Sequence, residues 1–189
     1  MEKGKIIFLN GVSSAGKTTL AKTLQLKLSE PFYWISVDTF IMMTPDKFLN
    51  KESSRIILNS ISAMHHTIKT YSDIGFNAIV DHVFEKSDWV QECVELLHSH
   101  PVLFVHVTCS LEELRRREKE RGDRNIGQAE SQIPMLKNAN IKDIYDITVD
   151  TFNNSTEECA DKIIEMLNEP EKFTAFKILW EQIKNNAEG

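Results

Sequence analysis

Residues near the N-terminus have the types and spacing of a phosphate-binding loop. Gly11, Gly16, Lys17 and Thr18 fit the pattern G-x-x-x-x-G-K-S/T. Glycines let the backbone curl so that successive N–H groups face one anion, and a following helix presents its positive end to the same anion. The lysine would reach the β- and γ-phosphates of ATP, and the threonine hydroxyl would hold Mg²⁺. The residues expected to bind the nucleotide are Gly11, Val12, Ser13, Ser14, Ala15, Gly16, Lys17, Thr18 and Thr19.

This motif does not name a reaction, because P-loop proteins include switches, motors and kinases. The sequence has no N-K-x-D run, which counts against a GTPase, and no L-S-G-G-Q run, which counts against a transporter ATPase. Three further features favour a kinase that acts on a small molecule.

The first feature is Asp38, which follows a strand predicted at Phe32–Val37. In an open parallel sheet, ligands bind outside the carboxyl ends of the strands. A carboxylate there could face the γ-phosphate and accept a proton from an acceptor hydroxyl. The alternative is that Asp38 caps a helix beginning near Thr39. The pattern alone does not separate the two interpretations.

The second feature is Asp81, which closes the apolar run Ile79–Val80. An acid at the end of a buried strand is the Walker B arrangement, which places a carboxylate near Mg²⁺ or its waters. We therefore predict Thr18 and Asp81 as the metal ligands, although a lone aspartate is also common in loops.

The third feature is a charged stretch at residues 112–124. Mixed charges usually form a solvated helix face, with i,i+4 pairs such as Glu113–Arg117. Here a Gly-Asp break separates Arg121 from Arg124, which favours a hinged lid instead. Guanidinium groups on such a lid would neutralise phosphate charge and exclude water. From the residues alone, the solvated helix face and the lid both remain open.

Apolar runs alternate with helical patterns, which indicates βαβ units and a parallel sheet. Five strands are predicted, at Lys5–Asn10, Phe32–Val37, Phe76–Val83, Val102–Thr108 and Tyr145–Thr151. The main helices are predicted at Lys17–Leu28, Ser54–Ile74, Trp89–Leu97, Leu111–Arg121 and Thr156–Leu167, with a loop between Arg121 and Tyr145. The fold class is therefore α/β, a three-layer P-loop sandwich with helices on both faces of a five-stranded sheet.

The length of 189 residues suits one domain. We expect a kinase domain at 1–168, with a lid at about 115–132, and a C-terminal helical extension at 169–189. This extension carries a helical stripe of four apolar residues, Phe173, Phe176, Trp180 and Ile183. The stripe packs back on the domain or forms an oligomer contact.

Composition excludes some classes of function. Hydrophobic residues make up 41% and charged residues 26%, which is typical of a globular protein. The net charge of −6 disfavours a nucleic-acid partner. Three cysteines without C-x-x-C spacing favour a reducing compartment over a disulfide framework or a zinc site. No signal peptide or membrane span is expected, so we predict a cytoplasmic protein.

Several sequence blocks together resemble the chloramphenicol phosphotransferase family, which are small P-loop kinases with a shikimate-kinase-like core. The blocks are LNGVSSAGKT, VDTF, IVDHVF, ERGDRNIGQAESQ and YDITVDT, in the family's order. The resemblance implies transfer of the ATP γ-phosphate to a hydroxyl of a small molecule, chloramphenicol in the founding case. It implies that Asp38 is the catalytic base, and that Arg121 and Arg124 lie on a lid over the nucleotide.

Two departures from the family pattern concern the acceptor. His82 stands where the family commonly has a second aspartate, and Lys137 and Asn140 lie where a histidine often precedes the last strand. A polar mismatch can change discrimination between substrates by orders of magnitude. We therefore expect a small neutral or weakly polar alcohol other than chloramphenicol.

Apolar residues after two strand ends, Phe40, Met42, Met43 and Phe84, could receive such an acceptor. Core packing is the alternative for at least half of Phe40–Phe48. A doubly charged nucleotide acceptor would need arginines, and none occurs between Lys17 and Arg55. Two other functions stay open, a P-loop ATPase that regulates a protein partner and a nucleotide or nucleic-acid kinase.

Overall fold

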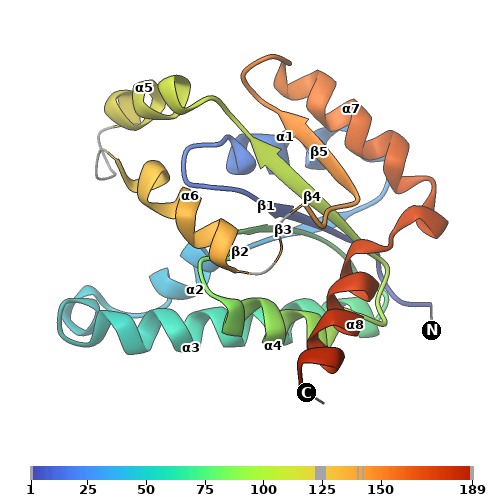
Figure 1. The fold of residues 1–189 in the computed structure, drawn as a ribbon, viewed down its shortest axis with the longest axis horizontal. Coiled ribbons are helices and arrows are strands. Elements are labelled where there is room, and N and C mark those ends of the chain that lie inside the picture. The colour runs from blue at the N-terminus through green and yellow to red at the C-terminus, as the bar shows by residue number, and fades with distance from the viewer. Residues whose placement is uncertain (1, 122–126, 140, 142, 188–189) are drawn as a thin grey trace.

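The fold is built on a five-stranded parallel sheet in the order β2-β3-β1-β4-β5 (Figure 1). The computed structural model describes residues 2–121, 127–139, 141 and 143–187. The strands are β1 (Ile6–Asn10), β2 (Phe32–Ser36), β3 (Asn77–His82), β4 (Val102–Thr108) and β5 (Ile147–Asp150). All five predicted strands are present. β4 has the predicted bounds, and the other four lie within their predicted ranges.

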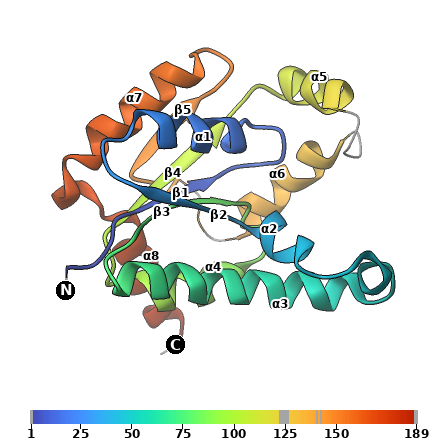
Figure 2. The same cartoon turned by 180° about the vertical axis from the view of Figure 1, so that it is seen from behind.

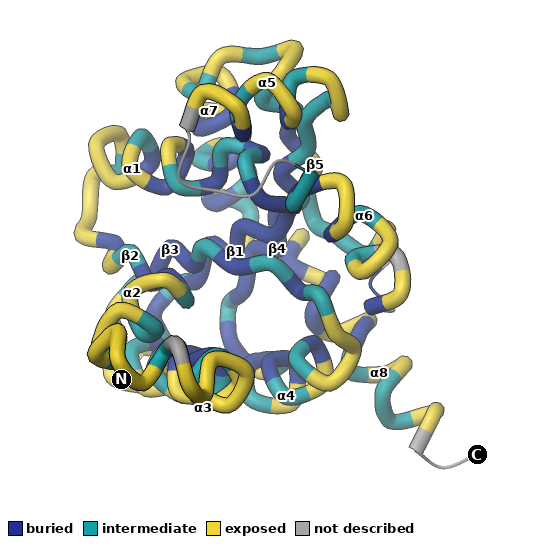
Figure 3. The backbone as a smooth tube through the Cα atoms, turned by 90° about the vertical axis from the view of Figure 1, so that its left-hand side faces the viewer, coloured by how far each residue is buried: buried dark blue, intermediate teal, exposed yellow. Residues whose placement is uncertain are grey.

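Helices cover both faces of the sheet, which confirms the predicted three-layer α/β fold (Figures 2 and 3). One face is covered by α1 (Lys17–Lys27) and α7 (Thr156–Leu167). The other is covered by α3 (Asp46–Asp73), α4 (Ser87–Leu97) and α8 (Ala175–Ala187). The remaining helices are α2 (Val37–Met42), α5 (Leu111–Arg121), α6 (Gln128–Asn138) and the short 3₁₀ helix η1 (Pro170–Lys172). Of the helices in the described part of the chain, none has the length and apolar character needed to span a bilayer.

The central strand β1 is buried on both faces, which explains its uninterrupted apolar run. Ile7 and Leu9 belong to the core beneath α1 and α7, whereas Ile6 and Phe8 belong to the core on the side of α3, α4 and α8. Burying one such side chain contributes roughly 2 kcal/mol. The sheet is therefore a rigid platform, and its carboxyl edge can hold side chains in fixed positions.

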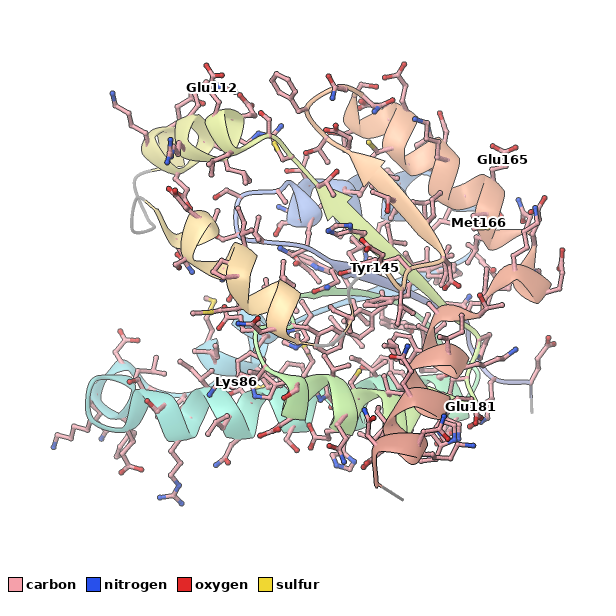
Figure 4. All side chains as sticks on the ribbon, viewed as in Figure 1. Lys86, Glu112, Tyr145, Glu165, Met166 and Glu181 are labelled. Atoms are coloured by element: carbon pink, nitrogen blue, oxygen red, sulfur yellow. The ribbon has the colours of Figure 1, made fainter. Side chains whose placement is uncertain are left out.

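Asn10, at the end of β1, ties three segments together at this edge. Its side chain is fully buried. Its Nδ2 donates to the Tyr145 hydroxyl at 2.9 Å, and its Oδ1 accepts from the Phe84 backbone N–H at 3.0 Å. Tyr145, labelled in Figure 4, lies near the centre of the molecule and stacks on the His106 ring with centroids 4.4 Å apart. These bonds fix the chain just before the P-loop begins.

The helix α6 lies where the sequence predicts a loop. Pro134 lies inside this helix, and a proline in the sequence argues against a helix interior. A contact from outside the segment organises the start of the helix. The Glu118 carboxylate accepts from the backbone N–H groups of Gly127 and Ala129, both at 2.7 Å. It satisfies donors that a helix N-terminus leaves unpaired, which local sequence does not reveal.

Replacing Glu118 by alanine should lower the free energy of unfolding by about 3 kcal/mol. The Glu118 residue is only 1% exposed, and the two N–H groups that donate to it would lose their acceptor. Urea denaturation measures this change. Glu120→Ala on the same helix is the control, since its exposed pair with Arg116 should contribute less than about 1 kcal/mol. Equal effects from both substitutions would contradict the role given to Glu118.

The long helix α3 begins at Asp46, ahead of the predicted Ser54. None of the described side chains from Asp46 to Asn59 is buried. This part of the helix therefore has no core-facing apolar stripe by which the sequence could reveal it. Glu52 departs from helical geometry, with φ −133° and ψ 30°. Beyond it the predicted helix is confirmed, and Ile61, Met64 and Ile68, which are spaced for one helix face, are buried in the core.

The C-terminal stripe packs back on the domain, as the first interpretation predicts. The Phe176 ring lies 5.7 Å from Phe8 and 5.2 Å from Phe104, centroid to centroid. Trp180 stacks on His98 at 4.4 Å. An oligomer contact through the exposed side of α8 stays a prediction.

Candidate active site

A cavity of about 560 Å³ opens at the carboxyl edge of the sheet. This is where open α/β sheets bind ligands. Its walls come from the P-loop, α2, α3, the end of β3, α4, α5 and α6. Six of the predicted nucleotide-binding residues line it, Ser13, Ser14, Gly16, Lys17, Thr18 and Thr19.

The P-loop backbone has the geometry of an anion-binding nest. Ser14 and Gly16 have φ of 61° and 92°, the left-handed region that turns successive N–H groups inward. Gly16 also stands at the N-terminus of α1. Only glycine fits at Gly11, because a Cβ there would lie 2.2 Å from the Val107 carbonyl oxygen. The buried Ser14 Oγ makes no hydrogen bond to the described part of the chain. These features fit a phosphate.

Lys17, Thr18 and Asp81 meet beside this nest. Lys17 Nζ donates to the carbonyls of Gly11 and Val12 at 2.9 and 3.0 Å and lies 3.8 Å from Asp81 Oδ1. Thr18 Oγ1 donates to Asp81 Oδ2 at 2.7 Å. The two predicted metal ligands are therefore in direct contact. A hydroxyl and a carboxylate are hard oxygen donors of the kind that Mg²⁺ prefers, so the site fits that ion.

Asp38 lines the same cavity, in the first turn of α2. The helix-cap interpretation of Asp38 is wrong, because Ser36 is the N-cap and its Oγ accepts from the Thr39 N–H at 3.4 Å. Ser36 pairs in register with Asp81 on the neighbouring strand. The sheet thus brings the chain around Asp38 next to the predicted metal ligands.

Arg117 lines the cavity, although sequence reasoning named it only as half of an i,i+4 pair on a possible solvated face. Its predicted pair with Glu113 is present, Nε to Oε1 at 2.8 Å. Its other end faces the P-loop, however. Nη1 and Nη2 donate to Thr151 Oγ1 and the Thr151 carbonyl at 3.1 and 2.9 Å, and Nη1 also reaches the Ser14 carbonyl at 3.4 Å. Thr151 Oγ1 in turn donates to the Ala15 carbonyl at 2.8 Å. Arg117 and Thr151 therefore brace the loop from α5 and β5.

Gln132 and Glu85 connect α6 to the P-loop. Gln132 is 5% exposed, and its Oε1 accepts from the Ser13 backbone N–H at 2.6 Å. Its Nε2 donates to Glu85 Oε1 at 2.7 Å. Sequence reasoning gave neither residue a role, although Gln132 lies in one of the blocks that resemble the family.

The apolar end of the cavity differs from the predicted acceptor surface. Its apolar lining is Val37, Ile41, Ile57, Ile61, Val83 and Trp89. Met42 and Met43 are 80% and 70% exposed, whereas Phe84 is fully buried in the core. Phe40 does not line the cavity. Core packing holds for Phe40, which is half-buried against the core, but not for half of the segment, because none of residues 40–48 is fully buried. Helix α2 directs Ile41 inward and the methionines outward.

His82 lines the cavity from the end of β3 and is 2% exposed. Burial lowers the pKa of its imidazole well below the usual value, and the nearby His65 and Lys17 lower it further. Of the other predicted positions, Arg124 and Asn140 lie outside the described residues. The structure describes the backbone of Arg121 and Lys137 but not their side chains. The role of the lid arginines stays a prediction.

Known proteins are similar to this chain in sequence and in fold. A protein of Mycobacterium tuberculosis, provisionally named an O-phosphotransferase, is 30% identical, and the match covers 87% of this chain and 83% of that protein. Among solved structures, an APS kinase of Mycobacterium tuberculosis in complex with AMPPNP and APS has a TM-score of 0.67, at 16% identity, and the match covers 89% of this chain and 99% of that one. A shikimate kinase of Acinetobacter baumannii in complex with shikimate has a TM-score of 0.66, at 15% identity, with 89% and 95% covered.

The two structures show that the predicted shikimate-kinase-like fold is correct. The family model of the chloramphenicol phosphotransferase-like proteins matches residues 4–168. This range contains every residue described above as lining the cavity. The chain therefore belongs to the chloramphenicol phosphotransferase-like family.

Proposed function

We propose that this protein is an ATP-dependent phosphotransferase that moves the γ-phosphate of ATP to a hydroxyl of a small molecule. One observation carries the proposal: four side chains from three separate segments line a single cavity, Lys17 and Thr18 from α1, Asp38 from α2 and Asp81 from β3. Phosphoryl transfer needs such an arrangement, with a phosphate clamp, metal ligands and a group that receives the acceptor's proton. The family and the fold support the same reaction class.

The phosphate end of the cavity would stabilise negative charge. Lys17 and the N–H groups of the P-loop nest would bind phosphate oxygens, and Arg117 would hold the loop in position. Thr18 and Asp81 would hold Mg²⁺, which would supply positive charge beside the transferring phosphoryl group. Preorganised charge of this kind usually provides the largest part of the rate enhancement.

The other end would hold the acceptor. Asp38 would orient the acceptor hydroxyl and take its proton, a contribution of roughly a hundredfold or more. The described residues that line the cavity include only two cations, Lys17 and Arg117, and both lie beside the P-loop. A charged phosphate acceptor would find no partner among the described residues at the apolar end. An uncharged alcohol therefore fits best.

The test is ADP formation in the presence of ATP, Mg²⁺ and a panel of metabolites and antibiotics, with mass spectrometry of the products. We expect an uncharged alcohol to gain one phosphoryl group. ADP formation that rises only with a protein partner would favour a regulatory ATPase. Efficient phosphorylation of a nucleoside monophosphate or an RNA end would favour a nucleotide or nucleic-acid kinase. Chloramphenicol turnover at about 10⁴ M⁻¹s⁻¹ or above would contradict our expectation that it is not the acceptor.

A further inference from the structure

His82 carries two buried polar atoms that the described protein leaves unpaired. Neither Nδ1 nor Nε2 has a hydrogen-bond partner in the described part of the chain. Buried polar groups in native proteins are nearly always paired, because an unpaired one costs about 1–3 kcal/mol. The ring nitrogens of His82 therefore require a partner that enters from outside the described chain.

The rings around His82 do not supply that partner. Phe84, His65, Trp89 and Phe8 lie at centroid distances of 5.0, 5.4, 6.0 and 6.2 Å. Phe84 and Phe8 have only carbon in their rings, and the Trp89 indole makes no hydrogen bond to His82. The fourth, His65, uses Nδ1 for a 2.7 Å bond to Glu92 Oε2, and its own Nε2 is also unpaired within the described residues.

A molecule bound in the cavity would lie next to His82, whose two ring nitrogens are buried. His82 lines the cavity beside Ile61, Val83 and Trp89, three residues of the apolar end. Asp81, the adjacent residue in β3, faces Thr18 and Lys17 at the phosphate end. Side chains of successive strand residues point to opposite faces of a sheet. His82 is therefore directed away from the phosphate chemistry, toward the layer of α3 and α4.

We propose that His82 determines acceptor specificity by hydrogen-bonding a second polar group of the acceptor. The acceptor is then an uncharged alcohol with an apolar body, which packs on Ile61, Val83 and Trp89 and carries a further hydroxyl. One imidazole nitrogen donates and the other accepts, so a hydroxyl, which does both, is a suitable partner. This inference rests on the proposed function, because it places the reacting hydroxyl at Asp38.

The test compares His82→Phe with His106→Phe. Both histidines pair in register with Asn10, one on each side of β1, and His106 does not line the cavity. The probes are uncharged alcohols and matched diols, among them phenethyl alcohol and styrene glycol, which differ by one hydroxyl. In wild type and His106→Phe, the diol should have the higher kcat/KM, by roughly tenfold. In His82→Phe that preference should vanish, and His82→Gln, which keeps a donor and an acceptor, should restore part of it.

AMPPNP affinity should be unchanged in all variants, which shows that each one is folded around an intact P-loop. If wild type phosphorylates a diol and His82→Phe keeps the same preference for it, the inference fails while the proposed function stands. If only anionic alcohols such as shikimate or D-gluconate are phosphorylated, the uncharged class is wrong. If wild type phosphorylates no alcohol, the inference and the proposed function fall together.

Discussion

Replacing Lys17 by alanine is expected to abolish measurable turnover and leave the protein folded. Its side chain is 7% exposed, and its ammonium group lies within the P-loop, bonded to two loop carbonyls. No other described residue places a cation within the loop, so phosphate charge in the transition state would lose its main counter-charge. The loss should exceed about a thousandfold in kcat. The rate of ADP formation with an accepted alcohol measures kcat, and thermal unfolding shows whether the variant is folded.

Lys22→Ala is the matched control for this substitution. Lys22 lies on the same helix α1 but is exposed, with its ammonium over the Trp34 ring at 5.6 Å. Its removal should leave kcat unchanged. A well-folded Lys17→Ala protein with wild-type kcat would remove the P-loop assignment.

Asp38→Asn should lower kcat by roughly a hundredfold or more and keep ATP affinity within a few-fold. An amide keeps the size and hydrogen-bonding capacity of the side chain but cannot take a proton from the acceptor. Steady-state kinetics with saturating ATP and an accepted alcohol measure the change in kcat. Asp46→Asn is the control, because Asp46 occupies the first turn of α3 as Asp38 does in α2.

The helix cap can be tested separately from the proposed base. Ser36→Ala removes the hydroxyl that accepts from the Thr39 N–H, which should lower stability by about 1 kcal/mol. Asp38→Asn should change stability much less, since Asp38 is not the cap. A near-wild-type kcat in Asp38→Asn would mean that this carboxylate has no part in proton transfer.

The sequence predicts strands and helices well where their periodicity is strong and their contacts are local. The bounds of β4, α5 and α7 match the predicted ranges. Helix α6 was missed because Pro134 obscures it and because Glu118, outside the segment, organises its first turn. Such a contact joins residues whose proximity only the folded chain establishes.

The same distinction separates the predicted and the missed parts of the site. The P-loop is contiguous in sequence, so its residue types predict its geometry directly. Arg117 and Gln132 reach the loop from other elements, Glu85 bonds to Gln132, and no local pattern marks them. Met42 and Met43 were placed wrongly because composition does not say which side of a short helix faces a cavity.

The first half of helix α3 is less deeply buried than the second, and this has a consequence for its dynamics. Its 28 residues are interrupted by the kink at Glu52. From Ser60 onward one face of the helix is buried in the core. The half before Ser60 has no buried residue among those described and extends past the end of the sheet (Figure 2). Ile57, on this half, lines the apolar end of the cavity, where we propose that the acceptor binds. Its amide and those before it should therefore exchange with solvent faster than those after Ser60. Substitutions in this half can alter which molecules fit while the folding free energy hardly changes, so substrate range and stability can evolve independently here.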